Sequence, residues 1–167
     1  YASRGLGDVY KRQNAGNRIA DVHGGLEGDT EMRLSDAYDL QAIDVLFLCS
    51  AHGESRKWME ANTVPAGVKV IDLAQDFRDE SDGFVYGLPE LNRDRIRTAE
   101  RVANPGCFAT AIQLALLPLA AAGLLTGEVH VTAVTGSTGA GVKPSATTHF
   151  SWRSDNISVY KAFTHQH

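Results

Sequence analysis

Two short, mainly apolar runs stand out in the first half of the chain, the first with a polar end and the second with an acidic residue near its C-terminal end. Residues 44–50 form the first run and residues 68–73 the second. Runs of this length are typical of central strands that are covered on both faces. Between them, residues 54–62 predict a helix with Trp58 and Met59 facing inward. Together these segments predict a strand–helix–strand unit with a right-handed crossover.

Polar and small residues follow both predicted strands. Ligands of open parallel sheets bind at the carboxyl ends of the strands. Residues 50–53 lie at one such end and residues 72–76 at the other. The candidate cofactor contacts in the first loop are Ser50, His52 and Gly53. For His52 the alternative is a loop histidine in water, and Cys49 is expected to pack in the core.

The pattern changes in the second half. Residues 107–117 are apolar on nearly every face, which is typical of a helix buried inside a domain. Residues 128–135 alternate and are rich in β-branched side chains, which predicts a strand with one buried face. The remaining segments predict smaller features: irregular connections with short strands over 18–40, a bend over 86–92, a helix with a charged exposed face over 91–98, and a very short strand at 102–103.

A tight turn delivers Cys107 to the start of the apolar helix. Pro105 fixes its own φ and pushes Asn104 toward extended geometry, while Gly106 permits backbone conformations closed to other residues. A thiol in the first turn lies beside unpaired N–H groups and the positive end of the helix dipole, which favours the thiolate. A cysteine in an apolar run can also be a small core residue. The turn and the helix start favour a nucleophile.

A loop of small residues follows the predicted strand at 128–135. Such a loop lets a backbone approach a ligand closely and offers N–H groups to an anion. A plain flexible turn is the alternative, and the order differs from a dinucleotide fingerprint because no clear helix follows. The candidate binding residues are Gly136, Ser137, Gly139, Ala140 and Gly141.

Two histidines close the chain, His165 and His167. In an extended segment, residues two apart lie on the same face. The pair is compatible with a general base, with two ligands for a metal such as zinc, or with a simple surface position.

Composition narrows the class of protein. The chain is 43% hydrophobic and 22% charged over 167 residues, which suits one soluble domain or parts of two. A net charge of -4 gives no basic surface for nucleic acid, and Pro118 and Gly123 interrupt the longest apolar stretch, so no membrane span is expected. Its two cysteines make no disulfide framework, and an activated thiol suits the reducing cytoplasm.

Residues 1–13 show no apolar periodicity that connects with the rest. One codon choice for residues 8–13 spells GAT GTG TAT AAG AGA CAG, which resembles a transposon end used to build sequencing libraries. We therefore predict that residues 1–13 are a non-native leader and leave them out of the fold prediction.

Four separated motifs carry a family resemblance, and they are collinear from about residue 23 to the last residue. They are Asn104, Pro105, Gly106 and Cys107 followed by Ala109, Thr110 and Ala111; residues 86–92; Gly139, Ala140 and Gly141 with Lys143 and Pro144; and residues 164–167. Together they resemble the N-acetyl-gamma-glutamyl-phosphate reductase family. Residues 44–53 also resemble the strand and His-Gly loop of that family's cofactor domain.

The resemblance implies an α/β fold: a partial Rossmann-like parallel sheet over residues 14–105, then part of an α+β catalytic domain over 106–167. It also implies NADPH-dependent reduction of N-acetylglutamyl 5-phosphate to the semialdehyde, a step of arginine biosynthesis, with Cys107 forming a thioester. The catalytic histidine maps to His165 or His167. The glycine loop would lie by the nicotinamide or phosphates of NADP(H), with residues 50–53 on the other side of the cleft. The full-length protein is expected to be a homo-oligomer.

The chain departs from the family's pattern in several places. The first strand and glycine-rich loop of the family are missing, as is the part after residue 167, so we expect a fragment that binds NADPH poorly and has little or no turnover. Val142 and Gln166 stand where many members carry a basic residue and an arginine. The alternatives are an aspartate-semialdehyde dehydrogenase-like acyl-phosphate reductase, a non-catalytic nucleotide-binding module, and a zinc hydrolase using Cys107, His149, His165 and His167.

Overall fold

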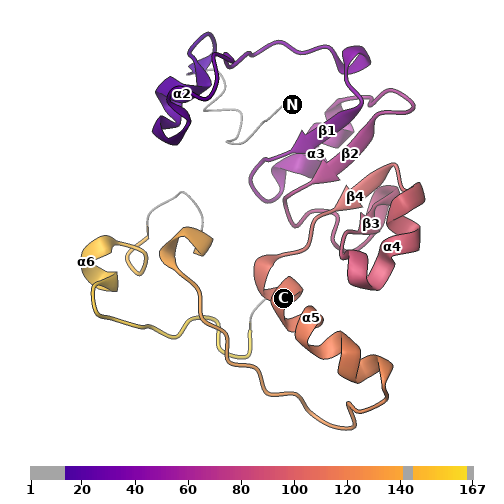
Figure 1. The fold of residues 1–167 in the computed structure, drawn as a ribbon, viewed down its shortest axis with the longest axis vertical. Helices are drawn as coiled ribbons and strands as arrows, with labels where there is room; N and C mark the ends of the chain where they lie inside the picture. Colours follow the sequence, from indigo (N-terminus) through magenta and orange to yellow (C-terminus); the bar gives the residue numbers. More distant parts are fainter. Residues whose placement is uncertain (1–13, 141–144, 165–167) are drawn as a thin grey trace. The chain divides into compact units, whose positions relative to one another are not determined.

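The computed structural model describes residues 14–140 and 145–164, and the chain divides into two compact units, Tyr1–Gly106 and Cys107–His167. The first unit holds an all-parallel sheet of four strands in the order β1-β2-β4-β3 (Figure 1). The strands are β1 Val45–Leu48, β2 Lys69–Asp72, β3 Val85–Tyr86 and β4 Arg101–Ala103. The predicted α/β class with a Rossmann-like parallel sheet is confirmed.

The strands β1 and β2 and the helix α3, Glu54–Ala61, form the predicted strand–helix–strand unit. The two strands pair in parallel, with Leu46 opposite Val70 and Leu48 opposite Asp72. Trp58 and Met59 of α3 pack against the buried cluster, as their positions in the sequence predict. The loop between β1 and α3 therefore emerges at the carboxyl edge of the sheet.

The strands β3 and β4 form the second half of this sheet, and the helix α4 (Pro89–Thr98) connects them. Pro89 lies in the first turn of α4, where its missing N–H costs nothing. The sequence predicted only a bend at β3, because a strand of two residues is too short to show a pattern. Gly87 comes directly after β3 and its backbone lies close to β4. A Cβ at this position would lie 2.7 Å from Val102 Cγ1 and 2.9 Å from the Ala103 backbone oxygen.

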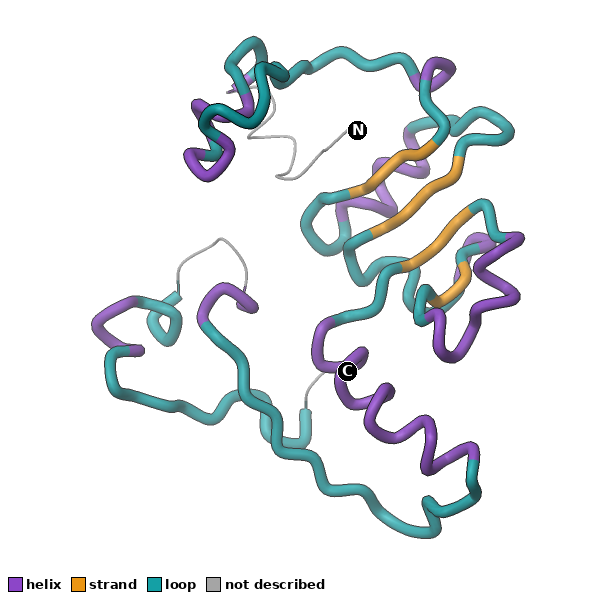
Figure 2. The backbone as a smooth tube through the Cα atoms, viewed as in Figure 1, coloured by secondary structure: helices purple, strands orange, loops and turns teal. Residues whose placement is uncertain are grey.

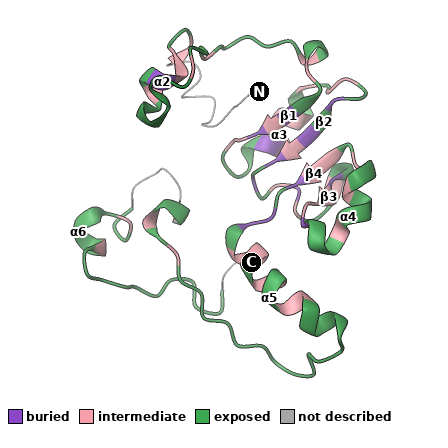
Figure 3. Cartoon of the chain, in the orientation of Figure 1, coloured by how far each residue is buried: buried purple, intermediate pink, exposed green. Residues whose placement is uncertain are grey.

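Aromatic and aliphatic side chains from the strands and the following loops make the core of this unit. Figure 3 shows buried positions along the strands of this unit. Phe77 and Phe84 stack with their ring centroids 4.1 Å apart and are 1% and 2% exposed. The buried cluster is Leu46, Leu48, Val68, Val70, Phe77, Phe84 and Ala103. Burial on both faces of the central strands explains why their sequences read as continuous apolar runs.

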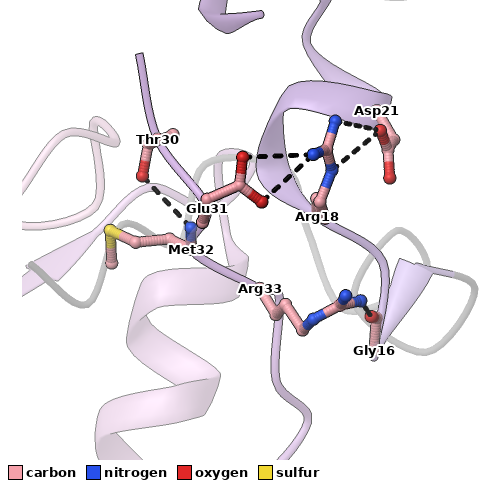
Figure 4. Close-up of polar contacts among 7 residues, drawn as sticks. All are labelled: Gly16, Arg18, Asp21, Thr30, Glu31, Met32 and Arg33. Atoms are coloured by element: carbon pink, nitrogen blue, oxygen red, sulfur yellow. Dashed lines mark hydrogen bonds and ion pairs between the residues drawn. The ribbon is translucent and has the colours of Figure 1, made fainter. Parts of the chain in front are cut away.

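Residues 14–34 form a small, locally bonded segment (Figure 4). It contains the helix α2, Ile19–Val22, and the 3-10 turn η1, Gly24–Leu26. Arg18 bonds the carboxylates of Asp21 and Glu31, and an isolated antiparallel bridge joins Arg18 to Arg33. The sequence predicted short strands here, but the described structure has only this single bridge and a short helix that was not predicted.

The second unit contains α5, Cys107–Ala121, the 3-10 turn η4, Ser137–Ala140, and α6, Phe150–Arg153, joined by long loops (Figure 2). The strand predicted over residues 128–135 is wrong, because this stretch is irregular. Strand residues must exchange hydrogen bonds with a neighbouring strand. The described residues of this unit supply none, so β-propensity alone does not produce the element.

The helix α5 begins at Cys107, as predicted, but two expectations about it are wrong. The sequence predicted a helix buried inside the domain, whereas every residue of α5 is exposed or half-buried. The expected helix ended at residue 117, whereas α5 continues through Pro118 and ends at Ala121. Across residues 14–140 and 145–164, no helix is long and apolar enough to cross a membrane.

Candidate functional site

Cys107 is an exposed thiol at the first position of α5. The turn before it is fixed by the sheet of the first unit. The Asn104 N–H donates to the backbone oxygen of Asp72 at 2.8 Å, which extends the β2–β4 ladder. Arg78 Nε donates to the backbone oxygen of Asn104 at 2.8 Å. Pro105 and Gly106 are buried. The chain therefore leaves the sheet by a turn hydrogen-bonded to β2 and to Arg78, and Cys107 follows as the first residue of the next helix.

The loop from Ser50 to Gly53 lies at the carboxyl end of β1, as the strand pattern predicts. Gly53 adopts a left-handed conformation, with φ of 85°, and is the N-cap of α3. Its N–H donates to Asp76 Oδ1 at 2.7 Å, and the Arg56 N–H donates to Asp76 Oδ2 at 3.0 Å. His52 Nδ1 accepts the Gln75 N–H at 3.2 Å. The loops after β1 and β2 are thus bonded to each other at one edge of the sheet.

A buried carboxyl lies beneath this edge. Asp72, the last residue of β2, is 0% exposed, and its Oδ1 accepts the Ser55 hydroxyl at 2.5 Å and the Ala74 N–H at 3.1 Å. The Ser50 and Ser55 hydroxyls are 2.7 Å apart. Burial raises the pKa of Asp72, and the bonds from Ser55 and Ala74 oppose that rise. Ser50 is therefore connected through Ser55 to a carboxyl group inside the sheet.

Sequence reasoning pointed to residues 72–76 as a strand end but missed the roles of Asp72 and Asp76. Asp72 Oδ2 is buried and has no hydrogen-bond partner among the described residues. Asp76 reaches a helix 20 residues and more away in the sequence. Acidic residues directly after a buried strand were the only available signal, and spacing alone could not say what they contact.

The glycine loop belongs to the second unit, where residues 137–140 form the short turn η4. The Gly139 N–H donates to the Gly136 oxygen at 3.2 Å. A Cβ on Gly139 would lie 2.5 Å from Thr135 Oγ1, so a larger residue there would require the threonine side chain to rotate. Gly136, Ser137 and Gly139 are described, whereas Gly141 lies outside the described residues. The role of this loop in cofactor binding stays a prediction.

The histidines of the tail are placed differently. His165 and His167 lie outside the described residues. His149 is exposed and caps α6, with its Nδ1 2.8 Å from the Ser151 hydroxyl, beside a shallow hollow lined also by Ser145, Ala146 and Trp152. In the part of the chain that the structure describes, no group of three or more His, Cys, Asp or Glu side chains could hold a metal ion. Two of the four ligands of the zinc alternative, His165 and His167, are not among the described residues, so it stays an alternative.

Family comparisons agree with this arrangement of a sheet followed by a cysteine helix. Residues 6–99 match the family model described as semialdehyde dehydrogenase, NAD binding domain, and residues 107–167 match semialdehyde dehydrogenase, dimerisation domain. The chain belongs to the semialdehyde dehydrogenase family. These descriptions support a nicotinamide dinucleotide cofactor and self-association. The predicted leader, residues 1–13, lies outside the described residues, although the first match begins at residue 6.

Individual relatives make the comparison more specific. The chain is 62% identical over 161 residues to the N-acetyl-gamma-glutamyl-phosphate reductase of Azobacteroides pseudotrichonymphae, covering 95% of this chain and 51% of the relative. It is 64% identical to the enzyme of the same name from Bacteroides thetaiotaomicron, covering 95% and 50%, and 50% identical to that from Flavobacterium johnsoniae, again covering 95% and 50%. The chain spans about half the length of the curated relatives it matches.

Proposed function

We propose that this chain is the nucleophile-bearing part of an NADPH-dependent reductase that converts N-acetylglutamyl 5-phosphate to its semialdehyde. The observation that carries the proposal is the position of Cys107, exposed at the first residue of α5 and directly after a turn bonded to the carboxyl edge of a parallel sheet. The similarity to N-acetyl-gamma-glutamyl-phosphate reductases over 95% of the chain supports the choice of substrate.

In the proposed reaction, the Cys107 thiolate attacks the carbonyl carbon of the acyl phosphate. A carbon–sulfur bond forms, the carbon–oxygen bond to phosphate breaks, and phosphate leaves with the electron pair. When bound, the dinucleotide supplies a hydride. Reduction of the acyl group breaks the carbon–sulfur bond, so the semialdehyde leaves and the thiolate is restored. His165 or His167 is the candidate for proton transfer during these steps.

The carboxyl edge of the sheet offers hydrogen-bonding side chains that suit a dinucleotide. His52 is exposed there, and Ser50 is half-buried and bonded to Ser55. Together with Gly53, these residues are proposed to contact the cofactor. The glycine loop of the second unit supplies a separate set of proposed cofactor contacts, Gly136, Ser137, Gly139, Ala140 and Gly141. The choice of NADP(H) over NAD(H) is part of the proposal and can be tested by comparing the two reduced cofactors.

The decisive test is acylation of the chain by a substrate acyl phosphate, because thioester formation needs no hydride transfer. We expect incubation with N-acetylglutamyl 5-phosphate to release phosphate and to add one acyl group to Cys107, detected by mass spectrometry. Cys107→Ser should reduce the rate of phosphate release by at least about a thousandfold, since the nucleophile is removed. The matched control, Cys49→Ser, keeps Cys107 and should be acylated at the original rate.

Other results would change the assignment. Preferential acylation by aspartyl phosphate would favour an aspartate-semialdehyde dehydrogenase-like enzyme. Acylation of neither cysteine would contradict the proposed chemistry and favour a non-catalytic nucleotide-binding module. We further expect steady-state turnover by this 167-residue chain to be far below that of a full-length relative, and comparable turnover would refute that expectation.

A further inference from the structure

Asp76 caps the helix α3 with both of its carboxylate oxygens. Oδ1 accepts the Gly53 N–H at 2.7 Å and Oδ2 accepts the Arg56 N–H at 3.0 Å. The first turn of a helix has four N–H groups without a partner inside the helix, and a negative charge there is favourable. Asp76 comes from the loop after β2, so this contact joins the loops that follow two neighbouring strands.

This capping makes the N-terminus of α3 a poor site for a cofactor phosphate. Phosphates bind at helix N-termini through the same backbone N–H groups that Asp76 already engages. A phosphate would also have to approach a carboxylate of the same charge. Ligand contacts from this loop must therefore come chiefly from side chains, and His52 is the exposed side chain with hydrogen-bonding nitrogens.

The residue before Asp76 fixes the protonation pattern of His52. The Gln75 N–H donates to His52 Nδ1 at 3.2 Å. A backbone N–H can only donate, so Nδ1 must present its lone pair and a neutral ring carries its proton on Nε2. Because Gln75 and Asp76 are adjacent, the same loop that caps α3 also sets the tautomer of the imidazole.

Arg56 holds this loop from the other side. Its guanidinium donates to the Asp76 backbone oxygen at 2.5 Å, to the Ser81 hydroxyl at 3.0 Å and to Asp82 Oδ2 at 2.8 Å. It also lies 4.6 Å from the centroid of the buried Phe77 ring. Asp76 is therefore anchored through both its backbone and its side chain, which suits a residue that orients a neighbour.

We propose that Asp76 is a positioning residue of the cofactor site: it holds the loop so that His52 offers a single donor, Nε2–H, to an oxygen acceptor of the bound nicotinamide dinucleotide. This inference rests on the function proposed above. The acceptor is a phosphate oxygen or the carboxamide oxygen of the nicotinamide, and the two sources can be separated with the halves of the cofactor.

Nuclear magnetic resonance of the chain labelled with ¹⁵N-histidine tests the proposal directly. Long-range ¹H–¹⁵N correlations report which ring nitrogen carries the proton, and His52→Asn identifies the signals of His52. The test variants are Asp76→Ala and Asp76→Asn. The matched control is Asp94→Ala, which removes the same charge from a side chain that is 95% exposed on α4. NADPH, nicotinamide mononucleotide and 2′-phospho-AMP are then titrated separately.

In the wild-type and Asp94→Ala chains, we expect the neutral form of His52 to carry its proton on Nε2. Asp76→Ala should give a mixture of tautomers, and Asp76→Asn should lie between them because its amide oxygen still accepts the Gly53 N–H. NADPH and one of its two halves should shift the Nε2–H signal. The Kd for NADPH should rise about tenfold in Asp76→Ala, which is the effect expected when one hydrogen bond, from His52 to the cofactor, is lost.

An unchanged His52 pattern in Asp76→Ala overturns the proposal, and if that variant does not fold, Asp76→Asn carries the comparison. NADPH binding that moves other signals but not those of His52 also overturns it, while leaving the proposed function in place. Because the chain is expected to bind NADPH poorly, the titration extends to millimolar NADPH, and if that moves no signal in the wild-type chain, the cofactor assignment itself fails. The tautomer comparison still decides whether Asp76 positions His52.

Discussion

The two units of the chain differ in how their apolar residues are covered. In the first unit, Phe77 and Leu46 are 1% and 0% exposed, and the apolar strands are covered by elements close by in the chain. In the second, α5 has the composition of a buried helix, yet Leu114 and Leu119 remain 41% and 42% exposed. In Figure 3, α5 carries the colours of exposed and intermediate residues. Composition tells which residues need burial, but only the presence of packing partners decides whether they receive it.

The largest expected difference between the units concerns aromatic residues. Phe77→Ala should lower the free energy of unfolding by about 3–5 kcal/mol, because it empties a fully buried site and removes the stack with Phe84. Phe163→Ala, at a fully exposed position of the second unit, should change it by less than about 0.5 kcal/mol. Chemical denaturation followed by circular dichroism measures both, and equal effects would contradict the contrast.

The buried carboxyl of the first unit gives a pH-dependent test. Burial raises the pKa of Asp72 above its ordinary value of 3.8, so the folded state binds more protons than the unfolded state between the two values. The stability contributed by this group therefore falls as the pH rises through that window and levels off above the raised pKa.

Asp72→Asn removes that titration while keeping an oxygen that accepts from Ser55 and Ala74. Relative to the wild type, the variant should gain stability as the pH rises from 3.8 through the raised pKa of Asp72, and the gain should level off above it. Denaturation across a pH series measures the difference. A difference that is independent of pH would show that Asp72 is not titrating as described. Asp36→Asn, at an exposed position, is the control.

A pair of glycines compares backbone packing in the units. Gly87→Ala should cost about 1–3 kcal/mol, because the new Cβ would lie 2.9 Å from the Ala103 backbone oxygen, which has little room to move. Gly127→Ala, with no atom within 4 Å of the added Cβ, should be nearly neutral. Thermal melting of the two variants tests the pair, and a cost at Gly127 as large as at Gly87 would be against it.

The smallest expected effect compares the two thiols. Cys107 is exposed at a helix start, and Cys49 is half-buried after β1. Iodoacetamide near neutral pH should modify Cys107 about tenfold faster, because access and the helix N-terminus both favour its reaction. Peptide mapping by mass spectrometry gives the two rates. Faster modification of Cys49 would remove the main chemical reason for assigning a nucleophile.

Much of the first unit could be predicted from the sequence, because β1, α3 and β2 each carry a continuous or periodic apolar pattern. The start of α5 could also be predicted, since proline and glycine directly precede it. The strand β3 was missed because two residues show no periodicity. Residues 128–135 gave the opposite error, a predicted strand that is not formed. Their alternating pattern favours a strand, but a strand also needs a neighbour with which to pair.

The candidate site divides in the same way. Ser50, His52 and Cys107 could be placed at an edge or a helix start by general rules about strand ends and turns. The contacts of Asp76 with Gly53 and Arg56 could not, because they join residues separated by 23 and 20 positions. Local pattern locates the edge of a sheet, whereas the partners at that edge depend on tertiary structure.

The order of strands has a consequence for synthesis. In the sequence β3 comes before β4, but in the sheet β4 lies between β2 and β3, and β4 is the strand with which β3 pairs. A nascent chain that stops short of Arg101 therefore carries β3 without the ladder that holds it in the finished sheet. Translation must proceed through Ala103, just ahead of the turn that leads to Cys107, before this part of the sheet can close.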